Sequence, residues 1–366
     1  MAPKSIQGNG TQKGRGAQSS PDPRFTESSR EVIDDGWAEQ ERPLLRTEVQ
    51  IDKSRTILTY NKSPDIPFDR SINPYRGCEH GCVYCFARPS HAYLDLSPGL
   101  DFESRLFAKP EAASLLAKEL AKPGYRPAPI ALGVNTDAWQ PIERKYGITR
   151  ELLKVLKEFG HPVSMITKSA LIERDIDLLA PMAEQGLVQV MVSVTSLDRE
   201  LSRRMEPRAA APHRRLQTIR TLRDAGIPVG VLVAPLIAAL NDSELESILA
   251  AAAQAGATSA GYVMLRLPNE LKVLFTEWLH QHYPLKAEHV LNRVRDIRGG
   301  SLNSSEFGRR MTGQGEYASL VKQRFRLARR KLGLGREGAE LRCDLFKVPA
   351  RAGDQMTLFD GEQPEL

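Results

Sequence analysis

Short apolar runs alternate with amphipathic stretches along the middle of the chain, and this alternation constrains the fold more than any other feature. Runs rich in Val, Ile and Leu predict strands at 129–134, 163–167, 188–194, 228–234 and 260–265. Stretches with helical spacing of apolar residues predict helices at 111–122, 150–159, 171–185, 212–225 and 243–255. Strands separated by single helices form a parallel sheet. The sequence therefore predicts an α/β protein, a partial (β/α)6 TIM-like barrel with its site at the carboxyl ends of the strands.

The rest of the chain divides by composition. Residues 1–45 are rich in Gly, Ser, Gln, Pro and charge, which predicts a disordered N-terminal segment. The barrel is expected over 46–268, followed over 269–348 by a mainly helical, basic C-terminal extension. A flexible tail is expected over 349–366.

The charge balance favours anionic partners without deciding among them. The formal net charge is +6, which suits nucleic acid but is shared by many enzymes of neutral substrates. The N-terminus lacks the apolar segment of a signal peptide, and no run of about 20 apolar residues predicts a membrane span. We therefore expect a soluble, cytoplasmic protein with no membrane partner.

Three of the four cysteines are crowded into one segment with the spacing C-x3-C-x2-C, namely Cys78, Cys82 and Cys85. Thiolates are the usual ligands of iron–sulfur clusters, and three of them leave one iron of a [4Fe–4S] cubane open. Gly77 and Gly81 allow the backbone to turn tightly around such a cluster.

A structural zinc site is the alternative for the same cysteines, with His80 or His91 as the fourth ligand. Zinc knuckles usually pair a C-x2-C with a second such pair, and the sequence has none. The cluster interpretation is therefore preferred.

The cysteine motif resembles the signature of the radical S-adenosylmethionine (SAM) superfamily, in which an aromatic residue, here Tyr84, precedes the third cysteine. The rest of the barrel resembles the branch that includes spore photoproduct lyase. The resemblance implies that the open iron binds SAM. One electron from an electron donor then cleaves SAM to a 5′-deoxyadenosyl radical, which abstracts hydrogen from a substrate.

The same resemblance implies three SAM contacts at strand ends, carried over by position to Thr136, Lys168 and Ser193, with Asn135 and Asp137 as neighbours. A lysine can pair with the SAM carboxylate, and hydroxyl groups can bond amine or ribose groups. The alternatives are that Lys168 is a solvated lysine at a strand end and that Ser193 is a small core residue.

Two further positions bear on the reaction. The lyase branch has a hydrogen-donating cysteine where this chain has Asn135, which puts direct thymine-dimer repair in doubt. Cys343 is a substitute donor if the C-terminal region folds over the site, and otherwise a small buried residue. Glu206, in a stretch with Arg203, Arg204 and Arg208, either orients a ribose or belongs to a charged loop.

The C-terminal region carries two candidate interaction segments. A predicted helix over 316–332 is basic and amphipathic, so that it either holds phosphates or presents a solvated face. Gln355-Met356-Thr357-Leu358-Phe359 resembles the peptide by which bacterial repair proteins bind the DNA sliding clamp.

Three functions remain open at this stage. The first is a radical SAM enzyme acting on nucleic acid, in a reaction like DNA repair. The second is a radical SAM enzyme with a small-molecule or protein substrate. The third is a zinc-stabilised nucleic-acid-binding protein without catalysis, which would be colourless where an iron–sulfur protein is brown.

Overall fold

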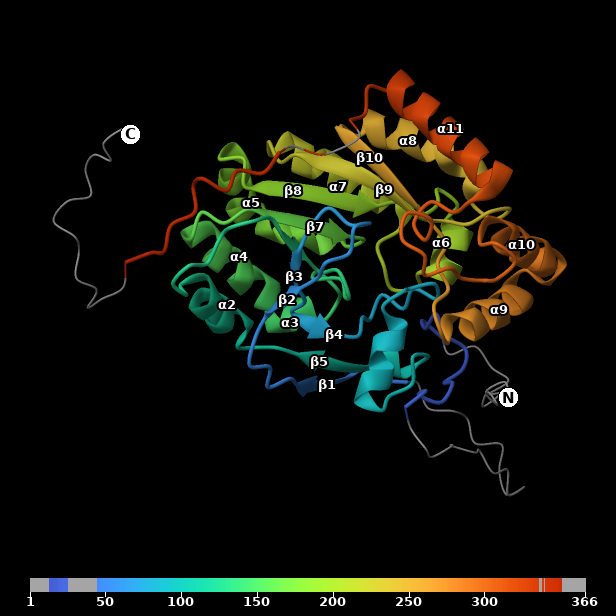
Figure 1. Ribbon diagram of the computed structural model, residues 1–366, viewed down its shortest axis with the longest axis horizontal. Coiled ribbons are helices and arrows are strands. Elements are labelled where there is room, and N and C mark those ends of the chain that lie inside the picture. The colour runs from blue at the N-terminus through green and yellow to red at the C-terminus, as the bar shows by residue number, and fades with distance from the viewer. Residues whose placement is uncertain (1–12, 26–44, 336–337, 339, 351–366) are drawn as a thin grey trace.

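A seven-stranded sheet forms the centre of the computed structural model, which describes residues 13–25, 45–335, 338 and 340–350 (Figure 1). Its strand order is β10-β9-β8-β7-β6-β3-β2. All neighbouring strands run parallel except β2, which is antiparallel to β3. The strands are β2 (Leu58–Tyr60), β3 (Arg70–Ile72), β6 (Ile130–Leu132), β7 (Val163–Thr167), β8 (Val188–Ser193), β9 (Val229–Leu236) and β10 (Ser259–Met264). The six parallel strands confirm the predicted partial (β/α)6 barrel.

Each parallel connection carries a helix, as the alternating pattern predicted. The five crossover helices are α2 (Ala112–Leu120), α4 (Ile148–Glu158), α5 (Ile176–Glu184), α7 (Pro212–Asp224) and α8 (Leu245–Gln254). Short helical segments in the connections are η1 (Arg88–Leu94), α1 (Asp101–Ser104), α3 (Glu143–Tyr146), η2 (Ala170–Asp175), α6 (Arg199–Met205) and η3 (Asp242–Glu244). The apolar faces of these helices and the buried strand residues pack into one continuous core.

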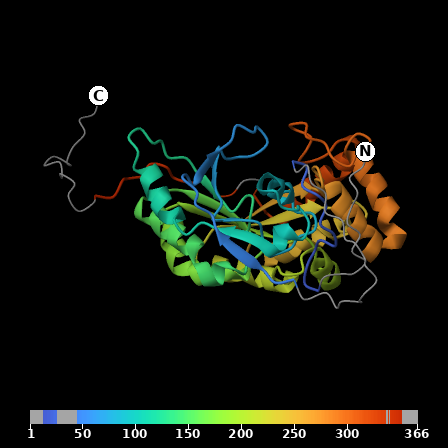
Figure 2. The ribbon, with the colours of Figure 1, turned by 90° about the horizontal axis from the view of Figure 1, so that it is seen from below.

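A second, three-stranded sheet lies beside the barrel, in front of the large sheet in the view of Figure 2. Its strands are β1 (Glu48–Ile51), β4 (Tyr75–Arg76) and β5 (Arg105–Ala108). It was not predicted, and neither was β3, the first barrel strand. Each of these strands has two to four residues and includes a charged residue, so none forms an apolar run long enough to predict a strand.

Residues 13–25, part of the segment that was predicted to be disordered, contact the barrel. The amide of Gly16 donates to Glu103 Oε2 at 2.9 Å, and that of Ala17 to Glu103 Oε1 at 2.7 Å. Ala17 is buried, and Arg15 donates to the carbonyl of Glu103 at 2.6 Å. We call residues 13–25 the N-terminal arm; residues 1–12 and 26–44 lie outside the described residues.

The C-terminal extension is helical as predicted and packs directly onto the barrel. It comprises α9 (Leu271–His282), α10 (Pro284–Ile297) and α11 (Gly315–Lys331). Apolar residues of α9 and α10 share a core with Cys82, Val83 and Tyr84. Helix α11 lies on α8, where Arg324 pairs with Glu246 at 2.6 Å.

Residues 340–350, which we call the C-terminal strap, run back along the barrel from α11 (red in Figure 1). The Arg342 amide donates to the carbonyl of Gly186 at 3.0 Å, just before β8. The Lys347 amide donates to the carbonyl of Phe159 at 3.0 Å, just before β7. The strap therefore crosses the amino-terminal ends of the strands.

None of the helices in the described part of the chain is long and apolar enough to cross a membrane.

Candidate active site

The three clustered cysteines lie on a loop at the carboxyl edge of the large sheet, where the barrel fold predicted them. Gly77 (φ +76°) and Gly81 (φ +67°) adopt the left-handed conformation that favours glycine, as expected for a tight turn. A Cβ at Gly81 would lie 2.7 Å from Glu103 Oε2, so a larger residue is excluded there. The Cys85 amide donates to the carbonyl of Cys82 at 3.2 Å, which closes the second turn.

Two of the three thiols are buried, Cys85 is half-buried, and all three interact electrostatically. Cys78 and Cys82 are 7% and 8% exposed. Burial raises the pKa of Cys78, and the neighbouring charges of Asp137, Cys82 and Cys85 contribute in the same direction. Burial also raises the pKa of Cys82. Buried thiolates that repel one another require a nearby cation, and the irons of a cluster would supply that charge. The donor set therefore fits an iron–sulfur cluster.

The two histidines considered as zinc ligands are engaged with protein oxygens. His80 Nδ1 lies 3.3 Å from Asp137 Oδ2, and His91 Nε2 lies 3.0 Å from the carbonyl oxygen of Arg105. Within the described ranges, no three Cys, His, Asp or Glu side chains are grouped as ligands of a single metal ion. Neither histidine is thus placed as the fourth member of a mononuclear site.

A buried ion pair stabilises the cysteine loop. Arg88 and Glu103 side chains are fully buried, and Arg88 Nη2 lies 2.5 Å from Glu103 Oε1. Arg88 Nε also donates to the carbonyl of Cys82 at 2.8 Å. Glu103 in turn accepts the amides of Gly16 and Ala17, so the N-terminal arm and the loop share one carboxylate.

The polar loop after β6 is bonded to the cysteine loop. Thr136 Oγ1 donates to the carbonyl of Gly77 at 2.7 Å, and Gln140 Nε2 donates to the same carbonyl at 3.1 Å. Gln140 Oε1 accepts the Glu79 amide at 2.8 Å. Asn135 is exposed at the tip of this loop. Gln140 was not predicted, because an isolated glutamine carries no recognisable sequence signal.

Asp137 joins two strand ends and the cysteine loop. Its carboxylate accepts Thr167 Oγ1 and the Lys168 amide, each at 2.8 Å, and faces His80. Burial alone would raise the pKa of Asp137, but His80 and these donors outweigh burial and hold the pKa at about 2. The carboxylate is therefore charged and already saturated with protein donors.

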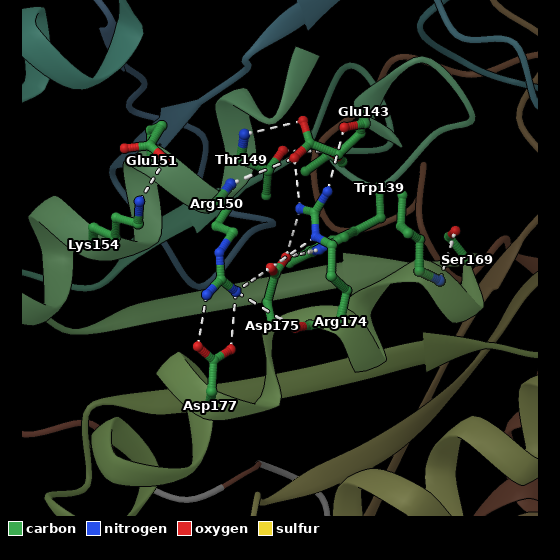
Figure 3. A network of polar contacts seen from close by, with 12 residues as sticks. Trp139, Glu143, Thr149, Arg150, Glu151, Lys154, Ser169, Arg174, Asp175 and Asp177 are labelled. Carbon is green, nitrogen blue, oxygen red and sulfur yellow. Dashed lines mark hydrogen bonds and ion pairs between the residues drawn. The ribbon is translucent and has the colours of Figure 1, made fainter. Parts of the chain in front are cut away.

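A buried polar network fixes the base of the same loop (Figure 3). Trp139 Nε1 donates to Asp175 Oδ2 at 2.8 Å, and Arg174 Nη2 lies 2.7 Å from Glu143 Oε1. The carboxylates of Glu143 and Asp175 are fully buried but each has an arginine partner. The loop that carries Thr136 and Asp137 is thus rigidly attached.

Of the remaining predicted SAM contacts, Lys168 and Tyr84 lie close to each other. Lys168 Nζ lies 5.8 Å from the ring centroid of Tyr84, and the charge of Lys168 lowers the pKa of Cys82 against the effect of burial. Ser193 ends β8 and is 1% exposed, with its carbonyl accepting Arg215 Nη1 at 3.2 Å. The structure brings Lys168 and Tyr84 together beside the thiols, whereas Ser193 is buried at a strand end.

Glu206 has a structural role that neither sequence interpretation described. Its buried carboxylate pairs with Arg215, not with the adjacent arginines, and accepts the hydroxyl groups of Tyr84 and Thr195. Arg208 pairs instead with Glu79 at 2.8 Å. Glu206 therefore connects the cysteine loop with β8 and α7.

Cys343 does not lie over the site, which corrects its interpretation as a substitute hydrogen donor. It belongs to the C-terminal strap at the amino-terminal ends of the strands, whereas the cysteine loop lies at their carboxyl ends. It is also half-exposed, so it is not a buried core residue either.

Comparisons with known proteins give a family, two relatives and a shared fold. A sequence model of the radical SAM superfamily matches residues 72–252. Proteins of Mycobacterium bovis and Mycobacterium tuberculosis, both described as uncharacterised, are 38% identical over 242 residues, covering 65% of this chain and 70% of theirs. A spore photoproduct lyase mutant, solved with bound AdoMet and dinucleoside spore photoproduct, matches with a TM-score of 0.55 at 15% identity. This match covers 78% of this chain and 80% of that chain, and it shows a shared fold.

Proposed function

Because this chain belongs to the radical SAM superfamily, we propose that Cys78, Cys82 and Cys85 bind the [4Fe–4S] cluster that the superfamily uses together with SAM. The protein is accordingly an enzyme, and an electron donor must supply electrons to its cluster. When bound, these cofactors supply a 5′-deoxyadenosyl radical that abstracts hydrogen from a substrate. The observation that carries the proposal is the gathering of three mutually interacting thiols, two of them buried and that of Cys85 half-buried, on one loop at the carboxyl edge of the barrel.

The residues around the thiols have distinct proposed tasks. Lys168, beside Tyr84 and Cys82, pairs with the SAM carboxylate, while the Tyr84 ring packs near the adenine. Thr136 and Asn135 would bind the amino group of SAM, and Ser193 would bind its ribose. Asp137 acts through its bonds to the Lys168 amide and to Thr167, which fix the position of Lys168.

We propose nucleic acid as the substrate. The net charge of +6 favours an anionic partner, and the fold is shared with a lyase solved with a dinucleoside lesion. Asn135 has no S–H group to return a hydrogen atom, so we propose a reaction other than the cysteine-dependent repair of that lesion. The sliding clamp is a further proposed partner, through Gln355–Phe359, which lies outside the described residues.

Anaerobic purification followed by reaction with SAM and dithionite tests the radical function. We expect a brown protein with broad visible absorption that releases 5′-deoxyadenosine. Alanine at Cys78, Cys82 or Cys85 should abolish both the colour and the product, whereas Cys343→Ala should retain them. A colourless protein with stoichiometric zinc, or product formation by the three cysteine variants, would overturn the proposal.

A further inference from the structure

Two arginines just beyond the sheet form no ion pair with a carboxylate of the described residues, whereas the buried Arg70, Arg88 and Arg215 each do. Arg266 follows the end of β10 and is half-buried. Its Nε is buried and has no hydrogen-bond partner among the residues that the structure describes, and its Nη1 contacts only the sulfur of Met311, at 3.7 Å. Arg298 donates to four backbone carbonyls, two of them at the end of β10. Guanidinium groups are costly to bury without a counter-charge.

A third guanidinium adds to this positive charge. Arg310 pairs with Asp65 at 2.6 Å, and Asp65 is the carboxylate that lies near this group. Burial lowers the pKa of Arg266, and the charge of Arg310 lowers it further. Burial and the charge of Arg266 together lower the pKa of Arg298 to about 10. We call Arg266, Arg298 and Arg310 the arginine cluster; its charges repel one another and Asp65 offsets them only in part.

Exposed aromatic rings flank the arginine cluster on both sides. Phe86, the residue after Cys85, is 44% exposed, and its ring centroid lies 5.6 Å from the guanidinium carbon of Arg266. Phe307 is 57% exposed, with the guanidinium carbon of Arg310 at 4.6 Å. Exposed rings next to cations are suited to single-stranded nucleic acid, whose phosphates take the charge and whose bases stack on the rings.

We infer that the arginine cluster binds a phosphate of single-stranded nucleic acid, with bases stacked on Phe86 and Phe307. The inference rests on the nucleic-acid part of the proposed function and gives it a location. Arg266 is the phosphate ligand, because its side chain is only half-buried and forms no ion pair with a carboxylate among the described residues. Arg298 positions the loop of Arg309 and Arg310 against β10. Phe86 directly follows the third cysteine, so a strand bound here runs past the proposed radical site.

The test measures binding of a fluorescein-labelled single-stranded DNA oligonucleotide to the anaerobically reconstituted holoenzyme by fluorescence anisotropy. Loss of one phosphate contact in Arg266→Gln should weaken binding about tenfold and reduce the salt slope by about 0.7. Phe307→Leu should weaken binding by about tenfold through lost stacking. Arg266→Lys, which keeps the charge, should bind within about threefold of the wild type. Lys322→Gln, on the exposed face of α11, is the matched charge control and should bind like the wild type.

Several results would overturn the inference. If the wild type does not bind the oligonucleotide, or if Arg266→Gln binds it as tightly as the wild type does, the proposed phosphate site is wrong. Equal weakening by Lys322→Gln assigns binding to α11. Competition by inorganic phosphate or a mononucleotide as strong as by the oligonucleotide assigns the site to a free phosphate compound. If Arg266→Gln raises the Kd for SAM but leaves oligonucleotide binding unchanged, Arg266 is assigned to the SAM carboxylate.

Release of 5′-deoxyadenosine without oligonucleotide separates this inference from the proposed function. If the wild type cleaves SAM but binds no oligonucleotide, the radical function stands and the nucleic-acid site fails. If it binds the oligonucleotide but never cleaves SAM, the radical function fails while the binding site stands.

Discussion

The buried pair of Arg88 and Glu103 allows a quantitative test of how the cysteine loop is held. Both side chains are fully buried, so replacing either partner with methionine leaves an uncompensated charge. Such a change costs about 3–5 kcal/mol in the free energy of unfolding. The double variant, with methionine at both positions, leaves no buried charge. It should therefore cost less than the sum of the single variants by about 2 kcal/mol or more.

Urea denaturation followed by circular dichroism measures these free energies for the three variants under reducing, anaerobic conditions. Trypsin digestion adds a second readout, because Gly16 and Ala17 bond to Glu103 and not to Arg88. The arm should become susceptible at Lys13, Arg15 and Arg24 in Glu103→Met but stay protected in Arg88→Met. Additive single effects, or equal cleavage of the arm in both variants, would refute this account of the loop.

Burial lowers the pKa of His161 to about 4, below its unfolded value of about 6.5. As the pH falls, the unfolded chain is protonated at this histidine before the folded protein is. The free energy of unfolding should therefore fall by about 3 kcal/mol between pH 6.5 and pH 4. His161→Gln should remove this part of the pH dependence in urea titrations, and an unchanged dependence would contradict the assignment. Cys343→Ala should leave the single-turnover product yield unaltered in a mass-spectrometric assay, since the strap lies far from the cysteine loop. Loss of product in this variant would show that Cys343 is a hydrogen donor after all. Deletion of residues 353–366 should abolish sliding-clamp capture in a pull-down, and retained capture would exclude Gln355–Phe359.

The barrel could be predicted because five of its parallel strands overlap apolar runs of five to seven residues. β7 has the predicted bounds, and β8, β9 and β10 differ from them by one or two residues. Burial on both faces forces a continuous apolar run, which is visible in a single sequence. β3 and the small sheet were missed because their pairing is determined by tertiary contacts over a few residues. The N-terminal arm was missed for a similar reason, since its order depends on the distant carboxylate of Glu103.

The cysteine motif could be predicted because its three cysteines lie within eight residues of one loop. The pairing of the charged residues around that loop could not be predicted. Glu206 has three nearby arginines in sequence, yet its partner is Arg215, which faces it from the start of α7. Arg266 has no unusual sequence neighbourhood, and its missing counter-charge appears only when β10, the 309–311 loop and Phe86 are brought together. Spacing identifies ligands that act within one loop. Charge compensation depends on which loops meet.

The position of Glu206 explains how one carboxylate can set the geometry of several site residues. It accepts the hydroxyl of Tyr84 from the cysteine loop and that of Thr195 from the end of β8, and it pairs with Arg215 on α7. Burial raises the pKa of Glu206 and outweighs the opposing charge of Arg215, so the net shift of this pKa is upward. Because the Tyr84 hydroxyl is fixed in this way, its ring has one orientation, and Lys168 lies over that ring. A phenylalanine before the third cysteine would keep the ring but lose this bond. The hydroxyl therefore adds a connection between the cysteine loop and the end of β8, a role that the aromatic pattern alone does not reveal.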